Sequence, residues 1–264
     1  MKMIKGKTPV KQYGVKILVL CFWLLLWEIT SRILHKEIFL PSPVVVLKTM
    51  LELIQGFAFW KTILFSFARI VLGFSLSVFV GTAFAVISYR FRLWKELISP
   101  LITVIKAMPV ASFIILALLW INKRNLSVLC SFTMVLPMVY ISVLQGLEAT
   151  DEKLLQMAKV FHLGSLKKIK AIYLPSVLPF FISGVSMGLG FCWKAGIAAE
   201  VIGLPSGSIG EQLYEAKLYL MTKELFAWTV VIILISILFE KAVMLIIRLL
   251  QQDAVVNSHD FEEQ

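Results

Sequence analysis

Three ionisable residues stand within long apolar segments of this 264-residue chain: Lys106, Lys194 and Glu200. A charge at the centre of a bilayer costs roughly 2.5–3.5 kcal/mol on insertion scales, so such residues usually face a water-filled cavity or the interior of a helix bundle. Two basic groups would favour an anion in transit. The sequence therefore predicts a solute pathway beside these three residues, with the alternative that each lysine pairs with a carboxylate such as Glu200 or extends to an interface.

Residues that could carry out a reaction are far apart in the sequence. The histidines are His35, His162 and His259, and they suggest neither a metal site nor a nucleophile–base pair. The glycine-rich stretch 203–210 lacks the Lys-Ser/Thr of a phosphate-binding loop. The three cysteines fall inside apolar segments and imply neither disulfides nor a metal cluster. We therefore expect a chain that is not an enzyme and has no catalytic residues, metal or cofactor, so that any energy for transport comes from another chain.

The composition places the chain in a membrane. Hydrophobic residues make up 59% of it and its mean hydropathy is +0.88, whereas roughly half of the residues of soluble domains are apolar. The formal net charge of +10 comes from Lys and Arg residues that cluster between apolar segments rather than on one basic face. Loop charges of this kind orient membrane spans. The expected partner is thus the lipid bilayer and not nucleic acid.

Apolar segments that can cross a bilayer as helices recur six times along the chain. Basic residues concentrate in residues 1–16, in a loop at 89–96 and in the interval 148–179, which places both termini in the cytoplasm. We expect a cytoplasmic N-terminal segment 1–16, a transmembrane domain 17–250 and a polar, disordered cytoplasmic tail 251–264. The expected spans contain residues 17–27, 63–88, 98–120, 126–147, 177–202 and 225–250.

Residue spacing also predicts local contacts. Glu28 and Arg32 stand four residues apart on one helix face and can pair. Ser208 and Glu211 form a capping box for a short outer helix that extends to Met221. Small residues recur every four positions in the second and fifth spans, where they let a neighbouring helix approach closely. These packing positions are Gly73, Ser77, Gly81, Gly184 and Gly188.

The interval 148–179 is polar and rich in lysine, yet it has its own helical pattern, which predicts a bent elbow at the membrane surface. Thr150 is expected to cap its first helix. The apolar stripe of that helix is expected to pack against the ends of neighbouring spans. Gly164 interrupts the helix, and a second short helix is expected to stop at Leu174-Pro175. The stripe consists of Leu154, Met157, Ala158 and Phe161.

The elbow resembles a loop of bacterial ATP-binding-cassette importer permeases, in which E-A-A is followed by three residues, Gly, nine residues and Ile-x-Leu-Pro. Gln156-Met157-Ala158 stands at E-A-A, His162 at the Gly and Ile172-Tyr173-Leu174-Pro175 at the end, with the spacing kept. Because the Gly is replaced by His162, the bend is expected two positions later, at Gly164. Further matches are Ser66, Arg69 and Gly73 in the second span, Lys106 and Pro109 in the third, and Trp193 and Ala198-Ala199-Glu200 in the fifth.

The wider match is to permeases of the nitrate, sulfonate and taurine type. The resemblance implies an all-α membrane protein of six spans, similar to type I importer permeases, in a bacterial inner membrane. It implies a pathway for a small, anionic solute made by two permease copies, ATPase subunits docked on the elbow, and an external solute-binding protein. The positions that it assigns to the ATPase contact are Gln156, Met157, Ala158, Phe161, His162, Gly164, Leu174 and Pro175.

Two other classes of function remain open at this point. A secondary transporter or channel uses an ion gradient and commonly has an inverted repeat or paired broken helices, neither of which is visible in the sequence. A membrane-embedded enzyme needs His, Asp or Glu clustered within its spans. Neighbouring genes for an ATPase and a solute-binding protein would distinguish an importer from both.

Overall fold

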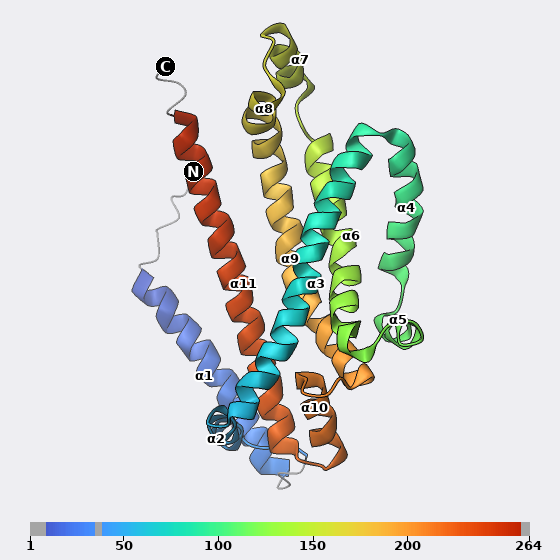
Figure 1. Ribbon diagram of the computed structural model, residues 1–264. Helices are drawn as coiled ribbons and strands as arrows, with labels where there is room; N and C mark the ends of the chain where they lie inside the picture. Colours follow the sequence, from blue (N-terminus) through green and yellow to red (C-terminus); the bar gives the residue numbers. More distant parts are fainter. Residues whose placement is uncertain (1–8, 35–38, 260–264) are drawn as a thin grey trace. The chain divides into compact units, whose positions relative to one another are not determined.

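The computed structural model describes residues 9–34 and 39–259, and the regular elements in these ranges are helices (Figure 1). The all-α fold predicted from the sequence is confirmed. Residues 1–8, His35 and the last residues of the tail lie outside the described ranges. In chain order the elements are α1 (Pro9–Leu34), α2 (Pro43–Ile54), α3 (Phe57–Arg90), α4 (Arg92–Ala107), α5 (Val110–Ala117), η1 (Lys123–Asn125), α6 (Leu126–Glu148), α7 (Glu152–Val160), α8 (Ser165–Lys168), η2 (Ile169–Tyr173), α9 (Leu174–Gly203), α10 (Ile209–Leu218) and α11 (Thr222–His259).

Within the described ranges, five helical segments are long and apolar enough to cross a membrane, and the bent pair of α4 and α5 makes a sixth if it is counted as one span. Counted in this way, the number of spans agrees with the six predicted. The five segments are Gly14–Leu34, Phe57–Arg90, Lys123–Glu148, Ser165–Gly203 and Thr222–Leu249.

The third span is not the continuous helix that the sequence suggested. Its two helices, α4 and α5, meet at an angle of 106°. The break lies at Met108 and Pro109, whose ψ angles of 126° and 125° are extended. Proline lacks an N–H for the helical ladder and pushes the residue before it out of the helical region, so Pro109 ends α4.

The sequence also predicted a loop at 89–96 and a disordered tail after residue 250, and both predictions need correction. Helix α3 ends at Arg90 and α4 begins at Arg92, with the extended Phe91 alone between them (φ −125°, ψ 106°). Helix α11 continues to His259, so that residues 251–259 extend the last helix.

The chain divides into two compact units. The first contains the described residues within Met1–Trp60 and Gln212–Val231, and the second contains those within Lys61–Glu211 and Ile232–Gln264. Helices α3, α10 and α11 contribute residues to both.

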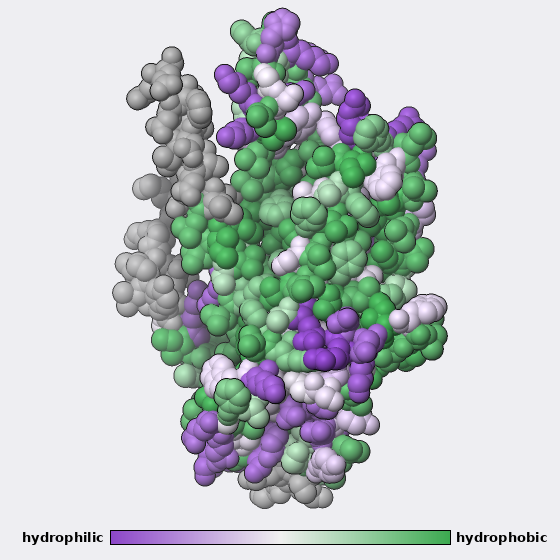
Figure 2. All heavy atoms as spheres, viewed as in Figure 1, coloured by the Kyte–Doolittle hydropathy of each residue, from purple (hydrophilic) through white to green (hydrophobic). Residues whose placement is uncertain are grey.

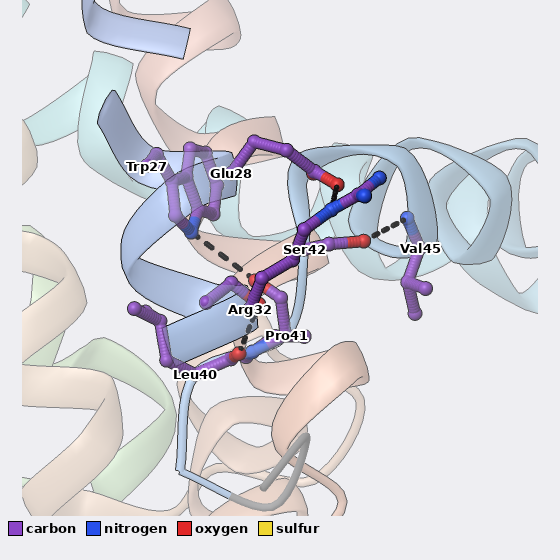
Figure 3. Close-up of polar contacts among 8 residues, drawn as sticks. Trp27, Glu28, Arg32, Leu40, Pro41, Ser42 and Val45 are labelled. Carbon is purple, nitrogen blue, oxygen red and sulfur yellow. Dashed lines mark hydrogen bonds and ion pairs between the residues drawn. The ribbon is translucent and has the colours of Figure 1, made fainter. Parts of the chain in front are cut away.

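In the first unit, side chains of α1 hold the segment that leads into α2. The Trp27 indole N–H donates to Pro41 O over 3.1 Å, and the Ser31 hydroxyl donates to Leu40 O over 2.8 Å (Figure 3). These bonds satisfy backbone carbonyls of a segment that has no helical ladder of its own.

Figure 3 also shows two further contacts of this unit, of which the Glu28–Arg32 ion pair was predicted from the sequence. Ser42 caps α2 by accepting a hydrogen bond from Val45 N over 3.3 Å. Arg32 Nε lies 2.7 Å from Glu28 Oε1, as their spacing indicated. The Arg32 side chain is 78% exposed, so we expect this pair to add little stability.

The second unit is built on α6 and α9, which pack along their lengths, with α3 beside them (Figure 1). One part of its core joins α5, α6 and α9 through Ile114, Ala117, Leu126, Cys130, Ala195 and Ala199. Another part is aromatic: the Phe239 ring of α11 makes edge-on contacts with the rings of Phe67, Phe74 and Trp193. Cys130 and Cys192 are buried here, whereas Cys21 in α1 is exposed.

Candidate translocation and coupling sites

Lys106 lies in the last turn of α4, immediately before the break at Met108 and Pro109, and its side chain is exposed. No carboxylate pairs with it among the residues that the structure describes. A cation in the last turn suits the negative end of the helix dipole. Lys106 therefore presents an unneutralised charge on a segment that is expected to lie in the membrane.

Lys194 is exposed on α9, in more apolar surroundings. Its Nζ lies 5.3 Å from the centre of the Phe191 ring, and Phe191 and Met187 are exposed on the same side of the helix. The ion pair with Glu200 that the sequence left open is not formed by either lysine within the described part of the chain. The two lysines thus differ in their neighbours.

Glu200 is fully buried in α9 and has a different kind of environment. Its Oε2 accepts a hydrogen bond from the Ser66 hydroxyl over 2.7 Å and one from Gly210 N over 3.3 Å. The Ser66 oxygen in turn accepts from Ile209 N over 2.9 Å. Glu200 and Ser66 therefore hold the first residues of α10, and this burial does not favour the expected role for Glu200 in the pathway.

The approach of α10 to α9 requires a glycine at position 210. A Cβ added at Gly210 would overlap the backbone of Glu200 and Val201. The capping box predicted for this helix is formed in part: Glu211 N donates to Ser208 Oγ over 3.0 Å, while Glu211 Oε2 accepts from Gly207 N over 2.6 Å. Sequence spacing gave the cap, but nothing local indicated that Gly210 contacts Glu200.

Arg69, found through the resemblance, is one helical turn from Ser66 on α3. Its Nε donates to Arg124 O over 2.6 Å and its Nη1 donates to Phe65 O over 3.2 Å. The guanidinium carbon stands 3.5 Å from the centre of the Phe65 ring. Arg69 thus fixes the 3-10 turn η1, just before α6, to α3.

The first helix of the elbow begins one residue later than predicted. Asp151, rather than Thr150, caps α7, and its Oδ1 accepts from Lys153 N over 2.8 Å. The Thr150 hydroxyl instead donates to Gly146 O over 3.4 Å at the end of α6. Both residue types can cap a helix, and the carbonyls left at the end of α6 draw Thr150 to the preceding helix.

The apolar stripe of α7 is not packed as predicted. Ala158 is buried, but Phe161 is 69% exposed and Met157 54% exposed, and Leu154 and Gln156 are exposed too. Figure 2 shows polar side chains gathered over α7 and α8, and mostly apolar side chains directly below them. Helix α7 therefore offers exposed apolar side chains within a polar, Lys-rich surface.

His162 adopts the left-handed backbone conformation, with φ of 48°. It follows the end of α7: Leu163 N donates to Ala158 O over 2.9 Å and His162 N donates to Lys159 O over 3.1 Å. This pair of bonds is the Schellman arrangement, whose left-handed position favours glycine. The left-handed turn therefore lies at His162, while Gly164, with φ of −61° and ψ of 152°, is the extended residue that separates this turn from α8.

Leu174-Pro175 does not end the second helix of the elbow. Helix α8 leads through the π turn η2 into α9, and Leu174 N bonds Ile169 O across that turn. Because proline has no N–H and its ring collides with a preceding carbonyl in a regular helix, a wider turn next to it keeps the chain helical. Elbow and fifth span therefore form one helical segment, Ser165–Gly203.

The small residues of α3 lie against α6. A Cβ added at Gly73 would overlap Val128 O, and the Ser77 hydroxyl donates to Phe132 O over 2.6 Å. A Cβ at Gly81 would lie 3.2 Å from the Val139 side chain.

The small residues of α9 also lie against α6. A Cβ added at Gly184 would lie 2.7 Å from Ser142 Cβ, and one at Gly188 would lie 2.8 Å from Val135 Cγ1. Real Cβ contacts are longer than this, so both glycines lie where the helix backbones come close.

Comparison with known proteins gives a consistent set of relatives. The family model for the binding-protein-dependent transport system inner membrane component matches residues 73–255. The chain is 25% identical, over 93% of its length, to a protein named as an aliphatic sulfonates transport permease in Bacillus subtilis, of which it covers 90%. It is 25% identical, over 86% of its length, to the taurine transport system permease protein of Escherichia coli, of which it covers 83%. The bicarbonate transport system permease protein of Synechococcus elongatus is 24% identical over 58% of this chain and 54% of its own length.

Proposed function

Because the chain belongs to the family of binding-protein-dependent transport system inner membrane components, we propose that two copies of it form the membrane pathway of an ATP-driven importer for a small solute with an oxyanion group. Members of this family are permease subunits rather than enzymes. They work with an ATPase subunit and an external solute-binding protein. A secondary transporter or channel is therefore the weaker alternative.

The main observation in favour of an anionic substrate is the environment of Lys106. This lysine is exposed at a helix break in a membrane segment, and within the described residues no carboxylate neutralises it. The substrates named for the relatives agree with this charge, since sulfonates, taurine and bicarbonate all carry a negatively charged oxygen group. Lys194 is proposed as a second basic group of the same pathway.

The ATPase is proposed to dock on the elbow. The exposed side chains of α7 and the turn after it, Gln156, Met157, Phe161 and His162, supply a surface on which a partner can bury apolar area. Leu174 and Pro175 are proposed to pass the movement of the elbow to α9, because the helix is continuous through them. The proposal requires that the elbow and both termini lie in the cytoplasm.

The proposal is tested by transport in vesicles. The chain is reconstituted with the ATPase and the binding protein encoded by neighbouring genes, and uptake of labelled taurine, ethanesulfonate and bicarbonate is compared with uptake of ethanolamine, which lacks the anionic group. We expect accumulation of at least one of the anions that requires ATP, and none of ethanolamine. Accumulation that needs an ion gradient instead of ATP would contradict the proposal.

The same assay ranks the two lysines. Lys106→Ala is expected to lower anion uptake more than Lys194→Ala, because Lys106 is next to exposed polar residues whereas Lys194 is next to Phe191. Basal ATP hydrolysis and assembly should be unchanged in both. Lys48→Ala, at an exposed lysine of α2, is the control. Uptake at the parental rate by both Lys106→Ala and Lys194→Ala would show that neither lysine contributes to the pathway.

A further inference from the structure

Helix α4 has three distinct faces. Ile98 and Ile102 are buried, and α4 packs on α6. On one side of these residues lies an exposed apolar face, with Leu93 83% exposed and Leu97 65% exposed. On the other side lies an exposed polar face that contains Arg92, Glu96, Ser99, Thr103 and Lys106. At 3.6 residues per turn, each face takes about a third of the circumference.

The two exposed faces require different surroundings. The apolar face, which also contains Leu101, suits contact with lipid. The polar face cannot be exposed to lipid at low cost, because charged and hydroxyl groups lose their water there. A membrane helix with this pattern must therefore turn its polar face toward water or toward other polar groups.

An open, shallow groove of about 910 Å³ lies against the first part of this face. Its lining residues all belong to α4 and are Arg92, Lys95, Glu96, Ser99, Pro100, Thr103 and Val104. One wall of the groove is thus supplied by this helix. In the proposed pair, the second copy of the chain would supply the opposing wall.

The charges along this face are neutralised by ion pairs at the beginning of α4 but not at its end. At the beginning of α4, Arg92 pairs with Glu96 over 3.1 Å and Lys95 pairs with Glu148 over 2.5 Å. At the other end, Lys106 has no ion pair within the described ranges. An anion that moves along this face would thus pass the neutralised pairs in the groove and meet the net positive charge of Lys106 beyond the end of the groove.

Hydroxyl groups lie between the two ends. The Thr103 hydroxyl donates to Ser99 O over 2.9 Å, so the lone pairs of the Thr103 oxygen are left to accept hydrogen bonds. The Ser99 hydroxyl makes no hydrogen bond with the described part of the chain, so its proton is available to a solute. A serine O–H is a suitable donor to a sulfonate or carboxylate oxygen.

The helix break gives a separate reason for water at this place. Non-helical backbone at membrane depth is tolerated only where it is buried in protein or lines a water-filled cavity. Ala107 and Pro109, on either side of Met108, are exposed. In the span formed by α4 and α5, the break thus marks the side that meets water.

We infer that the polar face of α4 is the surface that selects the solute in the pathway, with the Ser99 hydroxyl and the Lys106 ammonium group contacting an oxyanion as it passes. This inference rests on the proposed function. It adds Ser99 and Thr103 to the pathway, assigns the exposed face with Leu93 and Leu97 to lipid, and gives the break at Pro109 a role in opening the span to water.

Thiol labelling tests the surface without any need for transport. Ser99→Cys and Leu97→Cys are made in a chain with Cys21→Ser and treated in membrane vesicles with methanethiosulfonate reagents that are negatively or positively charged. The two sites lie two residues apart, so depth in the membrane is matched. We expect Ser99→Cys to react, and faster with the negative reagent, and Leu97→Cys to react at least about tenfold more slowly. Equal reaction at both sites would overturn the inference.

Transport by charge variants tests selection. Lys106→Gln is expected to lower anion uptake about tenfold and Lys106→Glu to lower it further, while Lys106→Arg keeps most of it. If Lys106 merely stabilised the end of α4, folded yield would fall and the uptake rate per folded molecule would not. Parental uptake by Lys106→Gln would overturn the inference. Absence of ATP-dependent anion uptake in the parent chain would contradict the proposed function instead, and the labelling result would stand by itself.

Discussion

His162 shows how a single backbone angle can decide which residue suits a position. Its φ of 48° lies in the left-handed region, where a side chain other than glycine costs roughly 1–2 kcal/mol. The Schellman bonds at Leu163 and His162 hold it there. Related permeases are expected to have glycine at this position, because glycine adopts the left-handed conformation without strain. In this chain His162 adopts the same conformation with the strain.

Substitutions at His162 test that strain. His162→Gly is expected to raise the stability of the elbow by up to about 1 kcal/mol, because the relief of strain exceeds the entropy that glycine loses on folding. His162→Val should lower it by more than that. Hydrogen exchange of the α7 amides would measure both. Gly164→Ala is the matched control: with φ of −61° and nothing within 4 Å of an added Cβ, it should be neutral or slightly stabilising. A more labile α7 in His162→Gly would contradict the assignment.

Glu200 is the residue whose loss should be most damaging to the second unit. Glu200→Ala would leave the Ser66 hydroxyl and Gly210 N buried without their acceptor, and each such group costs about 1–3 kcal/mol. Glu200→Gln keeps one oxygen and should cost less.

Thermal unfolding in detergent would separate these cases. Thr82→Val is a suitable control, because the buried Thr82 hydroxyl has no hydrogen-bond partner and the change keeps the shape. It should be neutral or stabilising. A Glu200→Ala variant as stable as the Thr82→Val variant would show that the contacts with α10 contribute little.

Among the helices, the approach of α9 to α6 depends on glycine. A Cβ at Gly184 would lie 2.7 Å from Ser142 Cβ and 3.1 Å from Met138 O, whereas one at Gly190, on the same helix, would meet nothing within 4 Å. Gly184→Ala is expected to cost about 1–3 kcal/mol through overpacking. Gly190→Ala should be neutral or stabilising because it lowers the entropy of the unfolded chain. Equal melting temperatures for the two variants would mean that α6 and α9 can move apart freely.

Some of these elements were accessible from the sequence. The length of the apolar segments predicted the spans that contain α6 and α9, and a spacing of four residues predicted the Glu28–Arg32 pair. These features depend on neighbours along one helix. The break in the third span was missed because apolar composition continues across Pro109, and proline inside a helix is also seen at Pro100 and Pro137 without such a break.

The candidate site was less accessible. Lys106 and Lys194 stand out as charges in apolar segments, but the sequence gives no reason to separate them. The hydrogen bond between Ser66 and Glu200 joins residues 134 positions apart, and local spacing cannot reveal it. The polar face of α4 was hidden for another reason: its groove depends on which face of the helix packs on α6.

For the whole molecule, the exposed part of the elbow is where a second protein should bind. Phe161→Asp is expected to prevent copurification of the ATPase while the membrane domain stays folded, because the exposed Phe161 ring would no longer be available for burial. His162→Asp should have the same effect, since Asp tolerates the left-handed conformation and removes the imidazole. Phe57→Asp is the control at another exposed phenylalanine, at the expected outer end of α3. Retained ATPase in both elbow variants would place the docking surface elsewhere.

The burial of two cysteines makes the protein easy to label chemically. Cys130 and Cys192 are shielded in the core of the second unit, whereas Cys21 is exposed. Replacement of Cys21 alone would thus leave the described part of the chain without a reactive thiol at its surface. A single cysteine introduced at the exposed Ser206, in the turn before α10, could then carry a fluorophore or spin label. Its reaction with an impermeant reagent from either side of intact cells would show which side of the membrane α10 faces.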